Sequence, residues 1–176
     1  MREKLSQRTK YLYGVGDLGF SLTSTIIGAY FAIFLTDVVG IAPRIAALAI
    51  FIGRTWDYFN DPFFGHLTDR TRTRWGRRRP FLLFGTIPFA LVFILMWYRP
   101  PFESDLALAI YYAGIFVLYD AAATLVYMPY FALTPELTSD YDERTSLTSI
   151  RAFFSIIGSL IAFTIPLLIV GGFSPE

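Results

Sequence analysis

Five long apolar stretches alternate with short polar segments along the chain, covering residues 11–36, 44–64, 81–98, 106–133 and 147–170. Each is long enough for an α-helix to cross about 30 Å of hydrocarbon, because a helix rises about 1.5 Å per residue. Backbone groups in lipid must be hydrogen-bonded within the protein, which favours helices over isolated strands. The pattern predicts an all-α bundle of membrane-spanning helices, forming a single membrane domain over residues 1–176.

Composition narrows the class of protein further. Hydrophobic residues make up 55% of the 176 residues, aromatic residues 18% and charged residues 16%, and the mean hydropathy is +0.50. A soluble domain carries about 25% charged residues, so this composition argues against a soluble enzyme, a disordered protein and a nucleic-acid binder. The formal net charge is +1, and the absence of cysteine excludes disulfides and thiolate metal sites.

The basic residues are distributed unevenly between the two sides of the predicted membrane domain. Eleven Lys and Arg residues fall on the side of the N-terminus: four before residue 11, six between residues 70 and 79, and Arg144. The segments on the other side hold only Arg44 and Arg99. This bias predicts a cytoplasmic N-terminus in a plasma (inner) membrane. The first stretch contains Asp17 and is too long for the core of a signal peptide, so we expect a retained helix.

Three charged side chains lie in the interior of the second apolar stretch, where burial in lipid is costly. Arg54, Asp57 and Asp61 follow one another at spacings of three and four residues, which places them on one helical face beside Asn60. A carboxylate at the centre of a bilayer costs about 2.5–3.5 kcal/mol on insertion scales. Two carboxylates one turn apart suit Na⁺ or a shared proton. The alternative is a structural pair of Arg54 with Asp57, which leaves Asp61 without a partner.

Two further acids lie in apolar stretches. Asp17 is surrounded by glycines that allow close helix approach, and both a packing role and a functional role remain open for it. Asp120 is followed by three alanines and Thr124, small residues that let a neighbouring helix approach or that open a cavity. Because acids inside a membrane are functional by default, a functional role is favoured for Asp120.

The connection over residues 65–80 has a patterned sequence, with a glycine, an Asp-Arg pair and a later Gly-Arg-Arg-Arg run. A basic run alone can anchor the topology or contact anionic lipids. The complete pattern resembles a loop signature of the major facilitator superfamily. That resemblance implies a role in the conformational cycle for Gly65, Asp69, Arg70, Gly76, Arg77, Arg78 and Arg79.

Further motifs occupy residues 13–17, 36–40, 54–57, 60–62, 72–76 and 129–136. In order and spacing they are similar to those of the glycoside–pentoside–hexuronide:cation symporters, a family within that superfamily. The chain resembles the N-terminal part of such a protein, with five of the six helices of its first half. The resemblance implies a C-terminal half beyond these 176 residues.

The resemblance also implies binding residues. The cation-binding positions of sugar-transporting members fall on Asp57, Asp61 and Thr124, with Asn60 beside them, so we expect Na⁺ or H⁺ at Asp57 and Asp61 and no cofactor. The two substrate-binding aspartates of such members fall on Ser21 and Tyr127, which gives no support for galactoside specificity. The expected substrate-contacting residues are Asp17, Ser21, Asp120, Tyr127, Phe131 and Arg151.

Three functions follow from this reasoning. The first is cation-coupled symport of a sugar or glycoside by alternating access. The second is the same fold carrying another solute, such as a lysophospholipid, and the third is a non-transporting membrane scaffold or sensor, against which the two acids of the second helix argue. The sequence shows no arrangement of a nucleophile with a neighbouring base that would predict an enzyme. The expected partners are a small solute, most simply a sugar, the lipid bilayer and the C-terminal half of the same protein, with no nucleic acid.

Overall fold

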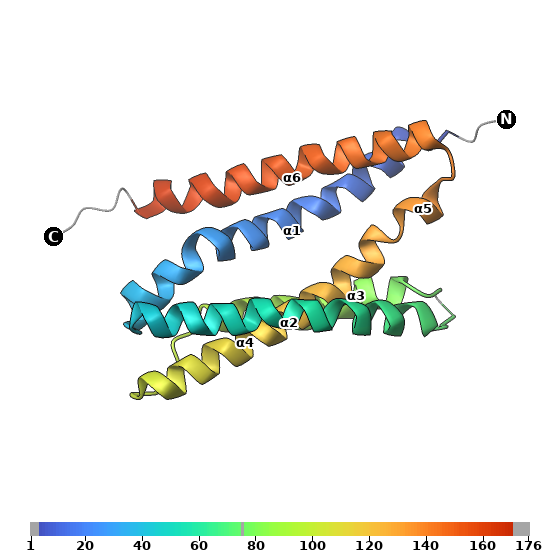
Figure 1. Ribbon diagram of the computed structural model, residues 1–176. Helices are drawn as coiled ribbons and strands as arrows, with labels where there is room; N and C mark the ends of the chain where they lie inside the picture. The colour runs from blue at the N-terminus through green and yellow to red at the C-terminus, as the bar shows by residue number, and fades with distance from the viewer. Residues whose placement is uncertain (1–3, 75, 171–176) are drawn as a thin grey trace. The chain divides into compact units, whose positions relative to one another are not determined.

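The computed structural model of the chain describes residues 4–74 and 76–170, except for the side chains of Asp61, Asp69 and Val170 (Figure 1). Its elements are α1 Gln7–Ile33, the π-helix η1 Phe34–Val39, α2 Pro43–Arg70, α3 Arg79–Met96, α4 Asp105–Phe131, α5 Thr134–Leu137 and α6 Tyr141–Val170. Within the described residues there is no β-strand, only an isolated bridge between Thr73 and Gly76. The predicted all-α class is confirmed.

The helices extend beyond the apolar stretches at their polar ends. α2 continues to Arg70 rather than to residue 64, and α6 begins at Tyr141 rather than at residue 147. The apolar pattern marks only the part of a helix that suits lipid, whereas backbone hydrogen bonding continues through polar turns. The start of α6 is stabilised by Asp140, whose Oδ1 accepts hydrogen bonds from the backbone amides of Asp142 (2.9 Å) and Glu143 (3.2 Å).

Four stretches of helix in the described part of the chain are long and apolar enough to cross a membrane. They are Gln7–Val39, Arg79–Met96, Asp105–Leu137 and Tyr141–Ile169. α2 has 28 residues, a sufficient length, but it is not among them. Arg54, Asp57 and Asp61 make its central turns too polar. The helix that departs from a purely lipid-compatible composition is therefore the one with the predicted cation ligands.

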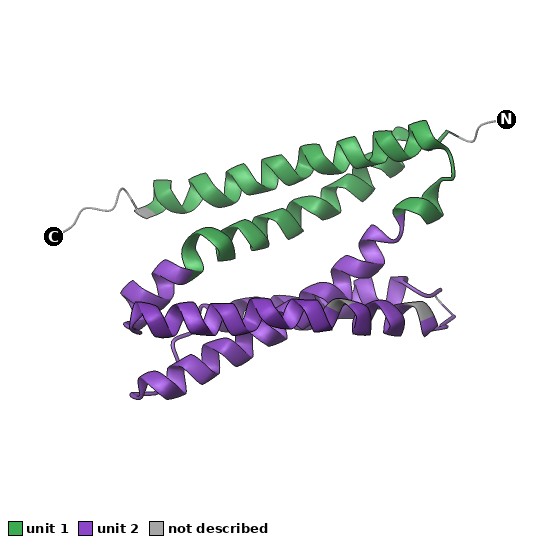
Figure 2. Cartoon of the chain, in the orientation of Figure 1, with its two compact units in different colours: residues 1–31, 134–176 green, residues 32–133 purple. Residues whose placement is uncertain are grey.

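Residues 32–133 form one compact unit, purple in Figure 2. Within it α4 packs against both α2 and α3. Glycines make close approach feasible: a Cβ added to Gly53 of α2 would overlap the Phe116 ring of α4, and one added to Gly85 of α3 would lie 2.9 Å from Val126 Cγ2. This packing brings the polar face of α2 against α4.

The described parts of residues 1–31 and 134–176 form a second unit, green in Figure 2. Its two long helices run parallel: Lys10 contacts Glu143 near their starts, and the Tyr30 hydroxyl donates a hydrogen bond to the Phe163 carbonyl (2.6 Å) further along both. The helices are close at Gly158, where an added Cβ would lie 2.6 Å from the Leu18 carbonyl oxygen.

Candidate functional site

Asn60 joins α2 to α4 through its side-chain amide. Its Nδ2 donates one hydrogen bond to Thr124 Oγ1 (3.0 Å) and another to Asp120 Oδ2 (3.1 Å). Only 1% of Asn60 is exposed. A carboxylate oxygen accepts and never donates, so the contact with Asp120 identifies the nitrogen end of the amide. The two hydrogen bonds hold the amide in one orientation.

Local helix geometry explains why these residues meet. Asp57 and Asn60 are three residues apart on α2, and Asp120 and Thr124 are four residues apart on α4, so each pair shares one helical face. Ala122 and Ala123 are buried on α4 and leave room for the neighbouring helix. The structure thus brings together three of the predicted cation ligands, Asp57, Asn60 and Thr124, on two facing helices. The side chain of the fourth, Asp61, lies outside the described residues.

Two groups at this site have oxygen atoms that accept no hydrogen bond from the described part of the chain. Asn60 Oδ1 is buried and has no hydrogen-bond partner. Asp57 is half-buried, and no described residue gives its carboxylate a hydrogen bond or ion pair. A buried acceptor without a donor is costly, and a hard cation relieves that cost by accepting the lone pairs. Amide, hydroxyl and carboxylate oxygens are the ligands that such cations prefer.

A cavity of about 280 Å³ opens beside these groups. Its lining comes from α2 and α4 and consists of Asp57, Asp120, Ala123, Thr124, Tyr127, Met128 and Phe131. The rings of Tyr127 and Phe131 are stacked on one wall, with centroids 5.6 Å apart and planes inclined by 17°. Asp120, Tyr127 and Phe131, predicted as substrate contacts, therefore share one cavity with Asp57 and Thr124, predicted as cation ligands.

Arg54 does not neutralise Asp57 in this structure. No ion pair joins the two among the described residues, and the Arg54 guanidinium lies over the Phe116 ring, with Cζ 5.5 Å from the ring centroid. Structural pairing of Arg54 with Asp57, the alternative considered for the sequence, is not the arrangement that the helix adopts.

The other three predicted substrate residues lie in the unit formed by α1, α5 and α6. Arg151 Nη2 and Asp17 Oδ1 are 3.4 Å apart, and each side chain is only 13% exposed. The Arg151 guanidinium also lies over the Tyr13 ring, with Cζ 5.8 Å from its centroid. Ser21 Oγ donates to the carbonyl oxygens of Asp17 (2.9 Å) and Leu18 (3.1 Å), so its proton is engaged by its own helix. In this unit Asp17 and Arg151 hold each other.

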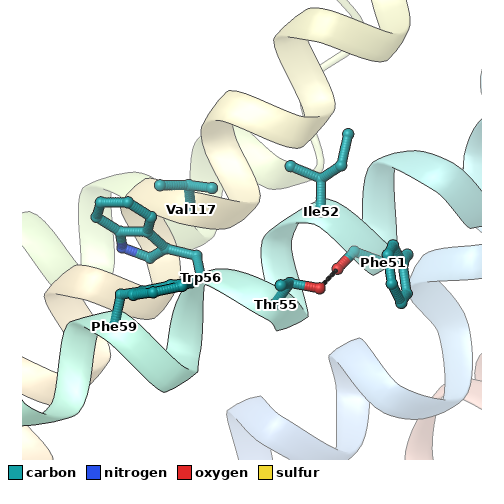
Figure 3. A pocket seen from close by; sticks show the side chains of 6 residues that line it. All are labelled: Phe51, Ile52, Thr55, Trp56, Phe59 and Val117. Atoms are coloured by element: carbon teal, nitrogen blue, oxygen red, sulfur yellow. Dashed lines mark hydrogen bonds between the residues drawn. The ribbon is translucent and has the colours of Figure 1, made fainter.

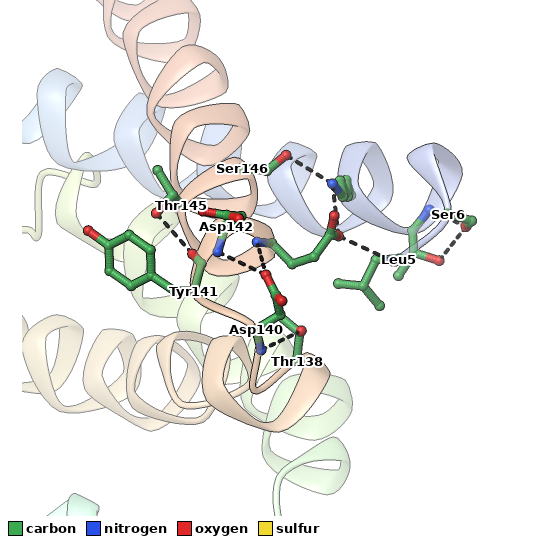
Figure 4. Close-up of polar contacts among 11 residues, drawn as sticks. Leu5, Ser6, Thr138, Asp140, Tyr141, Asp142, Thr145 and Ser146 are labelled. Atoms are coloured by element: carbon green, nitrogen blue, oxygen red, sulfur yellow. Dashed lines mark hydrogen bonds and ion pairs between the residues drawn. The ribbon is translucent and has the colours of Figure 1, made fainter. Parts of the chain in front are cut away.

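Sequence reasoning missed a buried cluster at the start of α6, drawn in Figure 4. Lys10 Nζ is 2.9 Å from Glu143 Oε2 and donates a hydrogen bond to Ser146 Oγ (3.0 Å), and the Leu5 amide donates to the same Glu143 oxygen (3.1 Å). Lys10 is only 4% exposed. Its position among N-terminal basic residues suggested a charge that sets membrane orientation, and no local signal distinguishes the buried lysine from its exposed neighbours.

The patterned loop contains a tight turn at Thr73 and Gly76. The Gly76 amide donates to the Thr73 carbonyl (3.0 Å), the Thr73 hydroxyl donates to the Gly76 carbonyl (2.7 Å), and Gly76 has φ +95°, a conformation that favours glycine. Arg70 Nη1 is 3.3 Å from His66 Nε2. Gly65 lies within α2, and an added Cβ would contact nothing within 4 Å. Arg77 and Arg79 are exposed and Arg78 is half-buried, while the Asp69 side chain lies outside the described residues.

A second cavity on α2 and α4, of about 230 Å³, is apolar and is shown in Figure 3. It is lined by Phe51, Ile52, Thr55, Trp56, Phe59 and Val117. Its one hydroxyl, of Thr55, donates to the Phe51 carbonyl (2.8 Å), which leaves the Trp56 indole N–H as the one other polar group of a lining that is otherwise apolar. The composition of this surface suits contact with lipid chains.

The sequence model of a transporter family matches residues 12–175. This family is described as MFS/sugar transport protein, where MFS stands for major facilitator superfamily. The chain belongs to this MFS family. The family predicted from the loop and helix motifs is therefore confirmed. Membership and the four apolar helices show that this MFS chain is an integral, multi-pass membrane protein.

Relatives of this MFS chain include symporters whose names give different solutes. An uncharacterised symporter of Synechocystis is 46% identical over 97% of the chain, and a putative glycoside/cation symporter of Escherichia coli is 38% identical over 95%. A sodium-dependent lysophosphatidylcholine symporter of Danio rerio is 33% identical over 97% of the chain. The aligned regions cover 32%, 36% and 32% of these three proteins, so the chain spans about a third of the length of its curated relatives.

Proposed function

We propose that these residues are the N-terminal part of a cation-coupled symporter, a transporter and not an enzyme, that moves a small solute by alternating access. The carrying observation is the buried Asn60 amide, which ties α2 to α4 while its own oxygen faces no protein donor. Families of transporters place solute and coupling-ion sites between helices near the membrane midplane. The names of the related symporters support coupling to a cation.

The proposed coupling ion is Na⁺, bound by Asp57, Asn60, Thr124 and Asp61. A proton needs only a carboxylate, whereas this site adds an amide oxygen and a hydroxyl, neutral groups that complete the coordination of a metal cation. Asp120 is hydrogen-bonded to Asn60 and lines the same cavity, so it connects the cation site to the solute. An H⁺-coupled mechanism is the outcome to distinguish by experiment.

The proposed solute is a sugar or glycoside held in the cavity beside Asp57. The stacked rings of Tyr127 and Phe131 offer a flat apolar wall for the less polar face of a sugar ring, and the Asp120 carboxylate accepts hydrogen bonds from hydroxyl groups. A lysophospholipid is the second candidate solute. The rings of Tyr127 and Phe131, the apolar side chain of Met128 and the name of the Danio rerio relative favour it.

Membrane orientation and the loop complete the proposal. The N-terminus and residues 71–78 face the cytoplasm of a plasma membrane, because these segments carry most of the arginines and lysines. Asp69, Arg70 and the arginines at 77–79, together with Gly65 and Gly76, stabilise one conformation of the transport cycle. The solute, the bilayer and the C-terminal half of the same protein are the proposed partners.

The deciding experiment measures equilibrium binding of radiolabelled Na⁺ to the complete gene product in detergent. Asp57→Asn should abolish saturable binding, because it removes a charged oxygen ligand. Asp105→Asn is the matched control: Asp105 is exposed in the first turn of α4 and lies away from the cavity lining, so binding should be unchanged. Binding by Asp57→Asn at wild-type affinity, or saturable uptake of sugars that depends on pH and not on Na⁺, would reject the sodium site.

A further inference from the structure

Arg54 carries a permanent positive charge one helical turn before Asp57, on the same face of α2. An arginine at this spacing is within reach of the carboxylate, since residues three apart are neighbours on the helix surface. No described residue forms a hydrogen bond or ion pair with Arg54. Its guanidinium instead lies over the Phe116 ring of α4, with Cζ 5.5 Å from the ring centroid.

The Phe116 ring is held firmly in that position. It is only 2% exposed, and it occupies space above Gly53, where a Cβ would overlap the ring. The Tyr119 ring contacts it edge-on, with centroids 6.4 Å apart. Gly53 on α2 thus admits the ring, and the ring presents its face to the next residue along the same helix, Arg54. A cation over an aromatic face is attracted by the ring quadrupole.

Two positions are therefore open to the Arg54 side chain. Over Phe116, where it lies here, the guanidinium leaves the Asp57 carboxylate free to bind a cation. The spacing of three residues on one helical face also allows the guanidinium to reach Asp57 by rotation of its side-chain torsions alone. In that second position the guanidinium neutralises the Asp57 carboxylate. It also occupies the carboxylate oxygens that the coupling cation would bind.

We propose that Arg54 is a tethered competitor for the coupling cation at Asp57, and that Phe116 positions it away from the carboxylate. This proposal rests on the cation site proposed above. When the coupling ion leaves, Arg54 moves to Asp57 and spares the membrane domain an uncompensated carboxylate. When the ion returns, the Phe116 face receives the guanidinium. Phe116 is thus a positioning residue, which acts on the ion through Arg54.

The test compares binding of radiolabelled Na⁺ in five variants of the complete gene product. Phe116→Leu should raise the Kd for Na⁺ by about fivefold, the equivalent of one lost cation–π contact, because the released arginine competes for Asp57. Phe116→Tyr keeps an aromatic face and should stay at the wild-type Kd. Arg54→Gln added to Phe116→Leu should restore the Kd of Arg54→Gln alone. Phe116→Met, whose flexible side chain fills irregular space without a ring, serves if the leucine variant does not fold.

Several results would overturn the proposal. If the raised Kd of Phe116→Leu persists when Arg54 is also replaced by Gln, the substitution acts through packing alone and the competition is rejected. An unchanged Kd in both Phe116→Leu and Phe116→Met also rejects the role of the ring. If either of these results is found while Asp57→Asn loses Na⁺ binding, the proposed cation site stands. Only the competition by Arg54 is then rejected. If the wild-type protein binds no Na⁺, the cation site and the competition are both rejected.

Discussion

Asp17 and Arg151 form an ion pair across 134 positions of sequence, with Asp17 Oδ1 and Arg151 Nη2 3.4 Å apart. Both residues were predicted to contact the solute individually. The structure shows that each is the other's partner between two parallel helices, with the Tyr13 ring against the guanidinium. A pair of opposite charges in this setting is neutral as a whole, so its first effect is on the packing of α1 against α6.

Removing one member of this pair should be more damaging than removing both. Asp17→Asn leaves the Arg151 guanidinium without its carboxylate, and we expect a loss of about 3 kcal/mol of stability, at the low end for broken buried pairs because the contact is long. The double variant Asp17→Asn/Arg151→Gln should recover part of that loss. Thermal unfolding followed by tryptophan fluorescence measures both. Equal destabilisation in the single and double variants would mean that the charges do not interact.

The close contact of α1 with α6 predicts opposite effects of alanine at two glycines. Gly158→Ala places a Cβ 2.6 Å from the Leu18 carbonyl oxygen and should destabilise the protein by about 1–3 kcal/mol. At Gly19, an added Cβ meets nothing within 4 Å, so Gly19→Ala should be neutral or stabilising by up to about 1 kcal/mol. Both are measured by thermal unfolding in the same detergent. Equal melting temperatures for the two variants would argue against close packing at Gly158.

The Thr124 hydroxyl should matter for the cation more than for the fold. Thr124→Val keeps the shape but removes the acceptor for Asn60 Nδ2 and a proposed Na⁺ ligand, so we expect the Kd for Na⁺ to rise about tenfold or more. Thr124→Ser keeps the hydroxyl and is the matched control. The measurement is binding of radiolabelled Na⁺, checked by thermal unfolding. Wild-type affinity in Thr124→Val would remove this residue from the site.

The role proposed for the loop can be tested by accessibility. Asp69→Ala should shift the protein toward conformations open to the cytoplasm, within the few kcal/mol that separate such states. The chain has no native cysteine, so a cysteine introduced at an exposed position such as Arg72 reports labelling cleanly. Asp105→Asn provides the control for removal of an acid elsewhere. Labelling at the wild-type rate in Asp69→Ala would mean that the loop only anchors the topology.

The helices themselves were predictable from local pattern, because bilayer thickness and helix rise together define how long an apolar stretch must be. The ends of α2 and α6 were not, since their polar outer turns look like loop when judged by hydropathy. The buried state of Lys10 was also invisible, because burial of a lysine depends on a carboxylate that lies 133 residues further along the chain.

The sequence alone determined the membrane class, the family and the acids of α2, because the cost of a charge in lipid and the order of the motifs can be read residue by residue. Only the tertiary structure decided what those groups contact. It turned Arg54 toward Phe116 rather than Asp57, joined Asn60 to Thr124 and Asp120, and paired Asp17 with Arg151. The reason is physical: spacing along one helix fixes which side chains share a face, whereas the partner of that face is chosen by the packing of helices distant in sequence.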